Sequence, residues 1–251
     1  MMPINRRQLF GFAVTAFLAG CAQPDAPVPP LPMGPPLDKP TSAAKEPVVN
    51  LGDTPPHFQV KFETSKGDFV VEIHSHWSPN GAAHFYELVK NGFYNDCRFF
   101  RVLPDFMVQW GINGDPKVNS KWHDANIQDD HPTGDNKKSN LRGFITYAKT
   151  GAPNSRSTQL FINYGDNSRL DATGFTPFGH VVEGMEVVDA INAKHREEPD
   201  QEQINARGNE YLKENFPDLD HIKKATLVDS AAAPTESARS DEDASKNDVP
   251  K

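Results

Sequence analysis

The sequence contains three short apolar segments that each carry a polar side chain: Phe99-Phe100-Arg101-Val102, Phe106-Met107-Val108-Gln109 and Gln159-Leu160-Phe161-Ile162. If these segments are strands, successive side chains point to opposite faces, so Phe100 and Val102 face away from Arg101. A buried polar group without a partner costs about 1–3 kcal/mol, so such exceptions mark structural pairs or functional sites. Arg101 therefore lies outside or in a polar cavity, and the residues alone leave both readings open.

The segments before this centre predict paired β-strands. Apolar residues alternate with polar ones over 58–62, and a second run follows at 69–73. Ser65-Lys66-Gly67-Asp68 supplies the turn between them. Further short strands and glycine-containing turns follow, including a last strand at 225–228. This pattern predicts a mostly β fold, a closed sheet with helices over its ends.

Helix signals are few. Ser78 and Pro79 predict the N-cap and first position of a helix over 82–90, and Asn91-Gly92 predicts its end. Apolar spacing predicts a second helix over 185–193. A third is expected over 201–215, before Pro217.

Composition excludes several classes of protein. The chain has 251 residues, a formal net charge of −8 and two cysteines. The acidic balance argues against nucleic-acid binding, because phosphate contacts need clustered Lys and Arg. Two cysteines cannot form a disulfide framework or a four-thiolate zinc site. We expect no metal or other cofactor, and a monomer.

The N-terminus has the pattern of an export signal. Arg6 and Arg7 precede a short apolar run within residues 1–20. Leu18-Ala19-Gly20-Cys21 resembles the bacterial lipobox, whose cysteine is lipidated after cleavage. The alternative is a buried N-terminal helix with an incidental cysteine. The lipobox predicts a lipid anchor on Cys21, with the protein on the periplasmic or other extracytoplasmic face of the bacterial cell envelope.

The regions on either side of the domain have a composition of their own. Of the 22 prolines, 11 lie between Ala22 and Pro56. Proline lacks an amide donor and favours extended chain, so 21–56 is predicted as a linker behind the lipidated cysteine. A proline-rich ligand for a binding domain is the alternative. Residues 230–251 lack aromatic side chains and predict a disordered polar tail, leaving one domain over 57–229.

Several segments together resemble cyclophilin-type peptidyl-prolyl isomerases of the bacterial branch, over about residues 57–193. Besides the three segments above, the matching pieces are Phe93-Tyr94, Gly143 to Ala148, Pro153-Asn154-Ser155, Leu170-Asp171, Phe178-Gly179 and Val182 to Met185. The resemblance implies an eight-stranded, closed antiparallel β-barrel capped by two α-helices. The helix expected over 201–215 would be additional, near the C-terminus.

The resemblance also implies roles for individual residues. Arg101 matches the catalytic arginine. The substrate-binding positions are the pocket wall (Phe106, Met107, Phe161, Leu170), its polar side (Gln109, Gln159), a residue flanking the substrate backbone (Ala148), the peptide-binding strip (Thr150, Asn154) and Phe175, near the place of a pocket histidine. The implied partners are proline-containing segments of exported proteins. A non-enzymatic module that binds proline peptides on the same barrel is the alternative.

The chemistry implied needs no covalent step. Rotation about a peptide bond is opposed by about 18–20 kcal/mol, because the C–N bond has partial double-bond character. A guanidinium that donates to the twisting amide favours the transition state over the planar ground state. Arginine suits this role because it stays charged and offers fixed donors.

Three departures from the family pattern surround the expected site. Extra residues follow Gln109 and place a large ring, Trp110, beside the site. Arg169 stands where well-known eukaryotic members carry tryptophan, and Phe175 stands near the place of the histidine.

Other constellations give weaker signals. His74 and His76 fall on one predicted strand face and could bind a metal, but we expect two exposed histidines. Asp129-Asp130 is expected to be a solvated turn rather than a cation site. Cys97 is expected to be a small buried hydrophobe.

Overall fold

The computed structural model describes residues 51–228. The predicted signal peptide, Cys21 and the tail over 230–251 lie outside these residues, as does most of the predicted linker. Within the described residues, no helix is both long and apolar enough to cross a membrane.

Residues 51–56, which we expected in the linker, already pack on the domain. A short 3₁₀ helix covers Leu51–Asp53. The hydroxyl of Ser75 donates to the carbonyl of Pro55 at 2.6 Å, and the amide of Ser75 donates to the carbonyl of Pro56 at 2.9 Å. The ordered domain therefore begins before its first strand.

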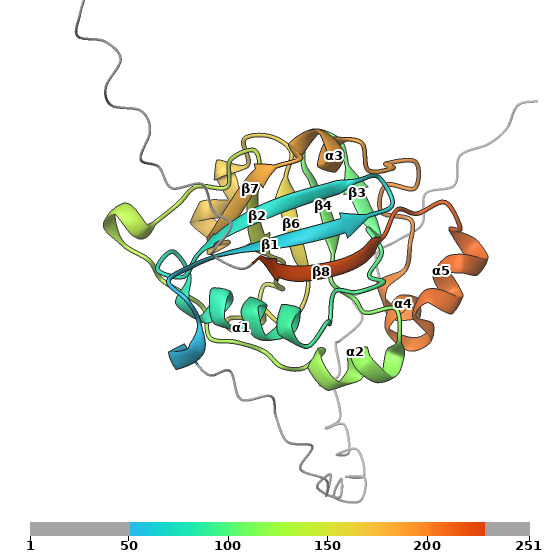
Figure 1. Cartoon of the computed structure of the whole chain (residues 1–251), viewed down its shortest axis with the longest axis horizontal. Coiled ribbons are helices and arrows are strands. Elements are labelled where there is room, and N and C mark those ends of the chain that lie inside the picture. The colour runs from blue at the N-terminus through green and yellow to red at the C-terminus, as the bar shows by residue number, and fades with distance from the viewer. Residues whose placement is uncertain (1–50, 229–251) are drawn as a thin grey trace, which may run out of the picture. The chain divides into compact units, whose positions relative to one another are not determined.

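Eight strands form one curled antiparallel sheet in the order β3-β4-β6-β5-β7-β2-β1-β8 (Figure 1). Their bounds are β1 His57–Thr64, β2 Asp68–His74, β3 Arg101–Leu103, β4 Met107–Trp110, β5 Phe144–Tyr147, β6 Leu160–Asn163, β7 Pro177–Glu183 and β8 Ile222–Val228. The mostly β prediction is confirmed, and β8 begins three residues before the predicted last strand. The closed barrel is not confirmed. The edge strands β3 and β8 are linked by a bridge between Arg98 and His221, just before each strand, and not by a strand ladder.

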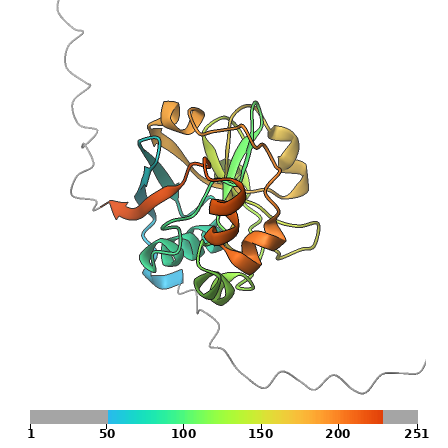
Figure 2. The same cartoon turned by 90° about the vertical axis from the view of Figure 1, so that its right-hand side faces the viewer.

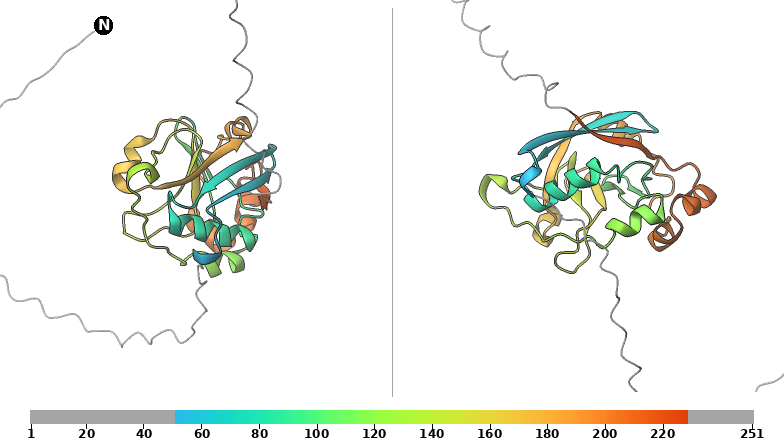
Figure 3. Two further views of the ribbon diagram at one scale, coloured as in Figure 1. Left: turned by 60° about the vertical axis from the view of Figure 1, so that its left-hand side comes forward. Right: turned by 60° about the horizontal axis from the view of Figure 1, so that its bottom comes forward.

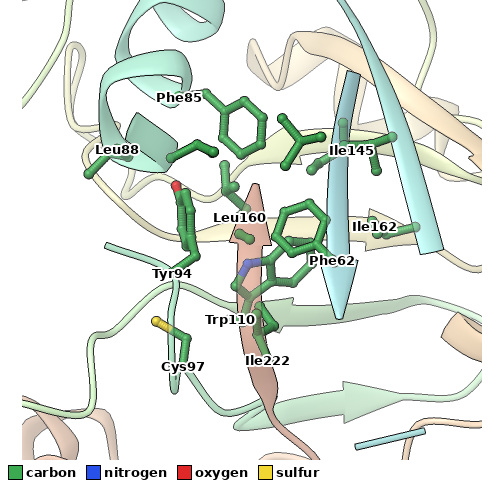
Figure 4. Close-up of a cluster of buried hydrophobic side chains, with 14 of the residues drawn as sticks. Phe62, Phe85, Leu88, Tyr94, Cys97, Trp110, Ile145, Leu160, Ile162 and Ile222 are labelled. Carbon is green, nitrogen blue, oxygen red and sulfur yellow. The ribbon is translucent and has the colours of Figure 1, made fainter. Parts of the chain in front are cut away.

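Alternation along the strands builds the core as predicted. Phe58, Val60 and Phe62 of β1 are buried on one face, and β2 pairs with β1 through the predicted turn. Figure 4 shows the centre of this core, where Phe62 lies among side chains of other strands and of the helix α1. Cys97 belongs to the same cluster, which confirms its prediction, and burial raises the pKa of its thiol.

Trp110 does not lie beside the site, and that expectation was wrong. Gln109 points to the outer face of β4, so the next side chain must point inward. The Trp110 ring is fully buried and lies edge-on to Phe62, with ring centroids 5.9 Å apart. It is a core residue.

Two helices lie at opposite ends of the curled sheet, α1 Pro79–Lys90 and α3 Met185–Asp189 (Figure 1). α1 begins and ends as predicted, whereas α3 is shorter than the predicted 185–193. Ser78 occupies the N-cap position, but its side chain does not cap. Asp130 does so from a distant loop, accepting from the amides of Asn80 and Gly81 at 3.0 Å each.

Three further helices gather at one side of the sheet: α2 Pro116–Trp122, α4 Gln201–Arg207 and α5 Asn209–Asn215 (Figure 2). α2 was not predicted, although Asp115 followed by Pro116 is its start signal. The single helix predicted over 201–215 is divided by Gly208, whose φ of 58° interrupts the helical backbone.

These helices have a small core of their own. It contains Phe100, Ile112, Ile204, Leu212 and Leu219. Gly208 lies against the segment before α2, and a Cβ there would collide with the carbonyl of Gly114. The amide of Asn209 donates to that same carbonyl at 2.8 Å. Two segments that lie far apart in the sequence therefore pack as one unit.

Candidate active site

The expected catalytic arginine lies on the outer face of the sheet, opposite the core. In strand register Arg101 of β3 is the partner of Gln109 of β4, which in turn is the partner of Phe161 of β6. Nη1 of Arg101 donates to Oε1 of Gln109 at 3.2 Å, and Nε2 of Gln109 donates to Oε1 of Gln159 at 2.7 Å. Three predicted polar residues thus form one hydrogen-bonded chain.

Glu197 holds the other side of the Arg101 guanidinium. Its Oε2 accepts from Nε at 3.0 Å and from Nη2 at 2.9 Å. The Arg101 side chain is 30% exposed and that of Glu197 is 60% exposed. Sequence reasoning missed this partner, because Glu197 lies 96 residues away in the segment before α4 and carries no local signal.

A polar groove of about 500 Å³ lies next to the hydrogen-bonded residues Gln109 and Gln159. Four predicted residues line it: Gln109, Ala148, Thr150 and Gln159. His123, at the end of α2, and Gln201, the first residue of α4, also line it. The unpredicted helix α2 therefore contributes to the wall of the groove.

Three of the predicted apolar residues, Phe161, Phe175 and Leu170, contact one another. The rings of Phe161 and Phe175 lie edge-on with centroids 5.9 Å apart, and the amide of Phe175 donates to the carbonyl of Leu170 at 3.4 Å. Met107 is buried on β4. Phe106 instead carries the guanidinium of Arg169 4.8 Å above its ring centroid.

Asn154 serves a structural role in the described structure. Its Oδ1 accepts from the amide of Asp129 at 2.7 Å, and its own amide donates to Oδ2 of Asp129 at 2.8 Å. Its φ of 54° fits asparagine, which tolerates the left-handed region. The side chain thus joins two loops beside the groove.

The family model "Cyclophilin type peptidyl-prolyl cis-trans isomerase/CLD" matches residues 59–208. A peptidyl-prolyl cis-trans isomerase of Acinetobacter baylyi is 37% identical over 136 residues, which cover 53% of this chain and 70% of the relative. Peptidyl-prolyl cis-trans isomerase B of Escherichia coli K12 is 34% identical over 139 residues, covering 53% of this chain and 82% of that protein. The chain belongs to the cyclophilin family.

Solved structures agree with this cyclophilin fold. A cyclophilin-type isomerase from Cryptosporidium parvum superposes with a TM-score of 0.51 at 21% identity, covering 68% of this chain and 98% of that one. AquaCyp293 from Hirschia baltica gives 0.50 at 19% identity, with 70% and 75% covered. At these identities the structural likeness shows the fold alone.

A buried arginine supports the groove of this cyclophilin, and sequence reasoning missed it. Arg156 is 1% exposed and donates to Oδ2 of Asp130 at 3.1 Å, to the Ser78 hydroxyl at 3.2 Å and to the carbonyl of Gln128. Its Nε lies 3.3 Å from Oδ1 of Asp129. The expected solvated turn at Asp129-Asp130 is therefore wrong, because Arg156 pairs with both carboxylates and the α1 amides donate to that of Asp130. No local sequence signal pairs residues this far apart.

Proposed function

We propose that this cyclophilin accelerates cis–trans rotation of X-Pro bonds without a covalent intermediate, with Arg101 as the group that stabilises the twisted amide. The observation that carries the proposal is the hydrogen-bonded series Arg101–Gln109–Gln159, which holds a permanent cation against two residues that line the polar groove. Phe161, which packs on Phe175, is the strand partner of Gln109. The remaining predicted positions would bind the peptide around this centre, as the family resemblance implies.

The geometry suits a reaction that requires only differential binding. A planar amide delocalises its nitrogen lone pair, whereas the twisted amide localises it and becomes a better acceptor. A guanidinium that Gln109 already orients donates to that nitrogen or to the neighbouring carbonyl without reorganising. Stabilisation that exists only in the twisted state lowers the barrier. Neither a general base nor a nucleophile takes part in this step.

The direct test is catalysed exchange of an X-Pro peptide, followed by NMR exchange spectroscopy at substoichiometric protein. Enhanced cis–trans exchange supports the proposal. A second candidate, a non-enzymatic module for proline-containing peptides, is favoured by the polar groove with its backbone-flanking residue Ala148. Peptide binding without enhanced exchange would establish that module and reject catalysis.

Glu197 is expected to restrain the isomerase by competing with substrate for the Arg101 donors. Exposed ion pairs are worth about 0–1 kcal/mol, so Glu197→Gln should raise kcat/KM by about two- to fivefold at low salt. The gain should shrink at high ionic strength, where screening already weakens the pair. The assay is the same X-Pro exchange at two salt concentrations.

Glu198→Gln is the matched control, because Glu198 is the neighbouring carboxylate and lies 3.5 Å from His195 rather than beside Arg101. Its kcat/KM should stay at the wild-type value. A fall in kcat/KM for Glu197→Gln would show that Glu197 positions Arg101 for catalysis instead of restraining it.

We also propose that the protein acts on exported polypeptides from the cell envelope, held there as a monomer by a lipid on Cys21. The support is the lipobox-like Leu18-Ala19-Gly20-Cys21 behind a charged and apolar segment. In a bacterial host, Cys21→Ser should move the protein from the detergent phase to the aqueous phase in a Triton X-114 partition. Equal partitioning of both forms would contradict the anchor.

A further inference from the structure

Four histidines (His57, His74, His76 and His180) and Glu72 gather at the outer face of the β1–β2 hairpin. β1 and β2 run side by side, with β7 next to β2 (Figure 3). In register, His57 of β1 is the partner of His74 of β2, and Glu72 of β2 is the partner of His180 of β7. The expected pair His74 and His76 does not share a strand, because β2 ends at His74. Antiparallel pairing instead brings His57 to His74.

Three of these side chains offer ligand atoms to one point. One ligand atom from each of His57, Glu72 and His74 lies within 4.8 Å of the other two. In a tetrahedral zinc site, with bonds near 2.1 Å, neighbouring ligand atoms lie about 3.4 Å apart. Each pair of ligand atoms would have to approach by at most about 1.4 Å to reach this spacing.

Two buried nitrogen atoms of the cluster have no hydrogen-bond partner and are available as metal ligands. Nε2 of His74 lies 3.0 Å from Oε1 of Glu72, yet it has no hydrogen-bond partner. Nδ1 of His180 is likewise buried without a partner. Buried polar atoms normally find partners, so these two imidazole nitrogens remain available to a ligand. A shared metal ion would satisfy the His74 nitrogen and the carboxylate together.

Trp77 covers the imidazole ring of His74. Its indole stacks on the His74 ring at 3.9 Å between centroids and on the His180 ring at 5.9 Å. The His74 side chain is consequently only 14% exposed, not exposed as expected. Gln59 donates to Oε2 of Glu72 at 3.3 Å and orients that carboxylate.

We propose that His57, Glu72 and His74 bind a divalent transition-metal ion, zinc in the first instance. A set of two imidazoles and one carboxylate suits zinc and leaves a fourth position open. His180 and His76 are candidates for that position, because the His180 ring centroid lies 5.5 Å from that of His74 and the His76 ring centroid lies 5.3 Å from that of His57. The ion would join the first residue of β1 to the last residue of β2 and so stabilise the hairpin against opening.

Calorimetric titration of the untagged full-length protein with ZnCl₂ tests the site. His57→Ala and His74→Gln should each weaken zinc binding by about tenfold or more, since even outer-sphere changes cost 10–100-fold. His131→Gln, which alters an exposed histidine outside the cluster, should bind as the wild type does. Zinc should also raise the Tm of the wild type and of His131→Gln, but not of the other two. Unchanged affinity in His57→Ala and His74→Gln would overturn the proposal.

Tryptophan fluorescence locates the ion independently of these variants. Cu²⁺ is a strong quencher at short range and should quench the Trp77 emission, reversibly on adding EDTA. Trp77→Phe retains two indoles, Trp110 in the core and Trp122 in α2. Cu²⁺ should not produce saturable quenching in this variant. Equal quenching with and without Trp77 would place the ion elsewhere and reject the site.

Discussion

Arg101→Ala is expected to lower kcat/KM for X-Pro exchange by about 10²–10³-fold, the usual cost of removing one donor that acts on the transition state. Arg101→Lys should recover little, because an ammonium cannot reproduce the fork that Gln109 and Glu197 now hold. The urea midpoint of both variants should stay close to the wild-type value. Arg101 is partly exposed and its ion pair with Glu197 is a surface pair, so little folding energy is lost.

Arg142→Ala supplies the control for a lost arginine charge. Arg142 is an exposed arginine that pairs with Asp189 at 2.6 Å and lies outside the predicted site. Its exchange rate should match that of the wild type. If Arg101→Ala retains the full rate, Arg101 is not the catalytic group and the mechanism must be replaced.

Arg156→Met is expected to destabilise the domain by about 3–5 kcal/mol, because it leaves the buried carboxylate of Asp130 without its cation. The Asp130 side chain is 5% exposed, and its remaining acceptor contacts are Ser78 and the amides at the start of α1. The measurement is urea unfolding. The loss in free energy of unfolding is calculated from the shift of the urea midpoint, with the slope m unchanged.

We expect Arg156→Met to disturb the groove as well as to lower the stability of the domain. Arg156 also pairs with Ile127 through a backbone bridge, which joins the loop that carries Asp130 to the strip that carries Thr150 and Asn154. Arg207→Ala is the control, because its partners Glu210 and Glu214 are exposed, and it should cost less than about 1 kcal/mol. A cost for Arg156→Met as small as that of Arg207→Ala would contradict the inferred burial of charge.

The features that the sequence predicted correctly are local ones. Alternation with a period of two marks β1 and β2, and Ser78-Pro79 marks the start of α1, because each signal is contained in a few neighbouring residues. The polar centre was predicted in the same way, since Arg101, Gln109 and Gln159 each interrupt an apolar segment. Their mutual hydrogen bonds depend on how β3, β4 and β6 pair, which short local patterns do not specify.

The features that were missed depend on contacts between distant segments. Trp110 was assigned to the site because the inserted residues after it drew attention, although alternation from Gln109 already directs it inward. Arg156 and Asp130, like Arg101 and Glu197, find one another only when the fold is complete. The histidine cluster has the same origin, because His57 meets His74 across a hairpin rather than along a strand.

The contact between Gly208 and Gly114 has a consequence for protein engineering. The segment inserted after β4 contacts the segment inserted before β8 at Gly114 and Gly208. Neither glycine has room for a side chain. A shortened variant that trims one insertion would uncover the apolar side chains of the other, including Leu212 and Ile112. Phe100 shares that core and directly precedes Arg101 in the chain. The two insertions are therefore best transplanted, shortened or removed together, as a single cassette.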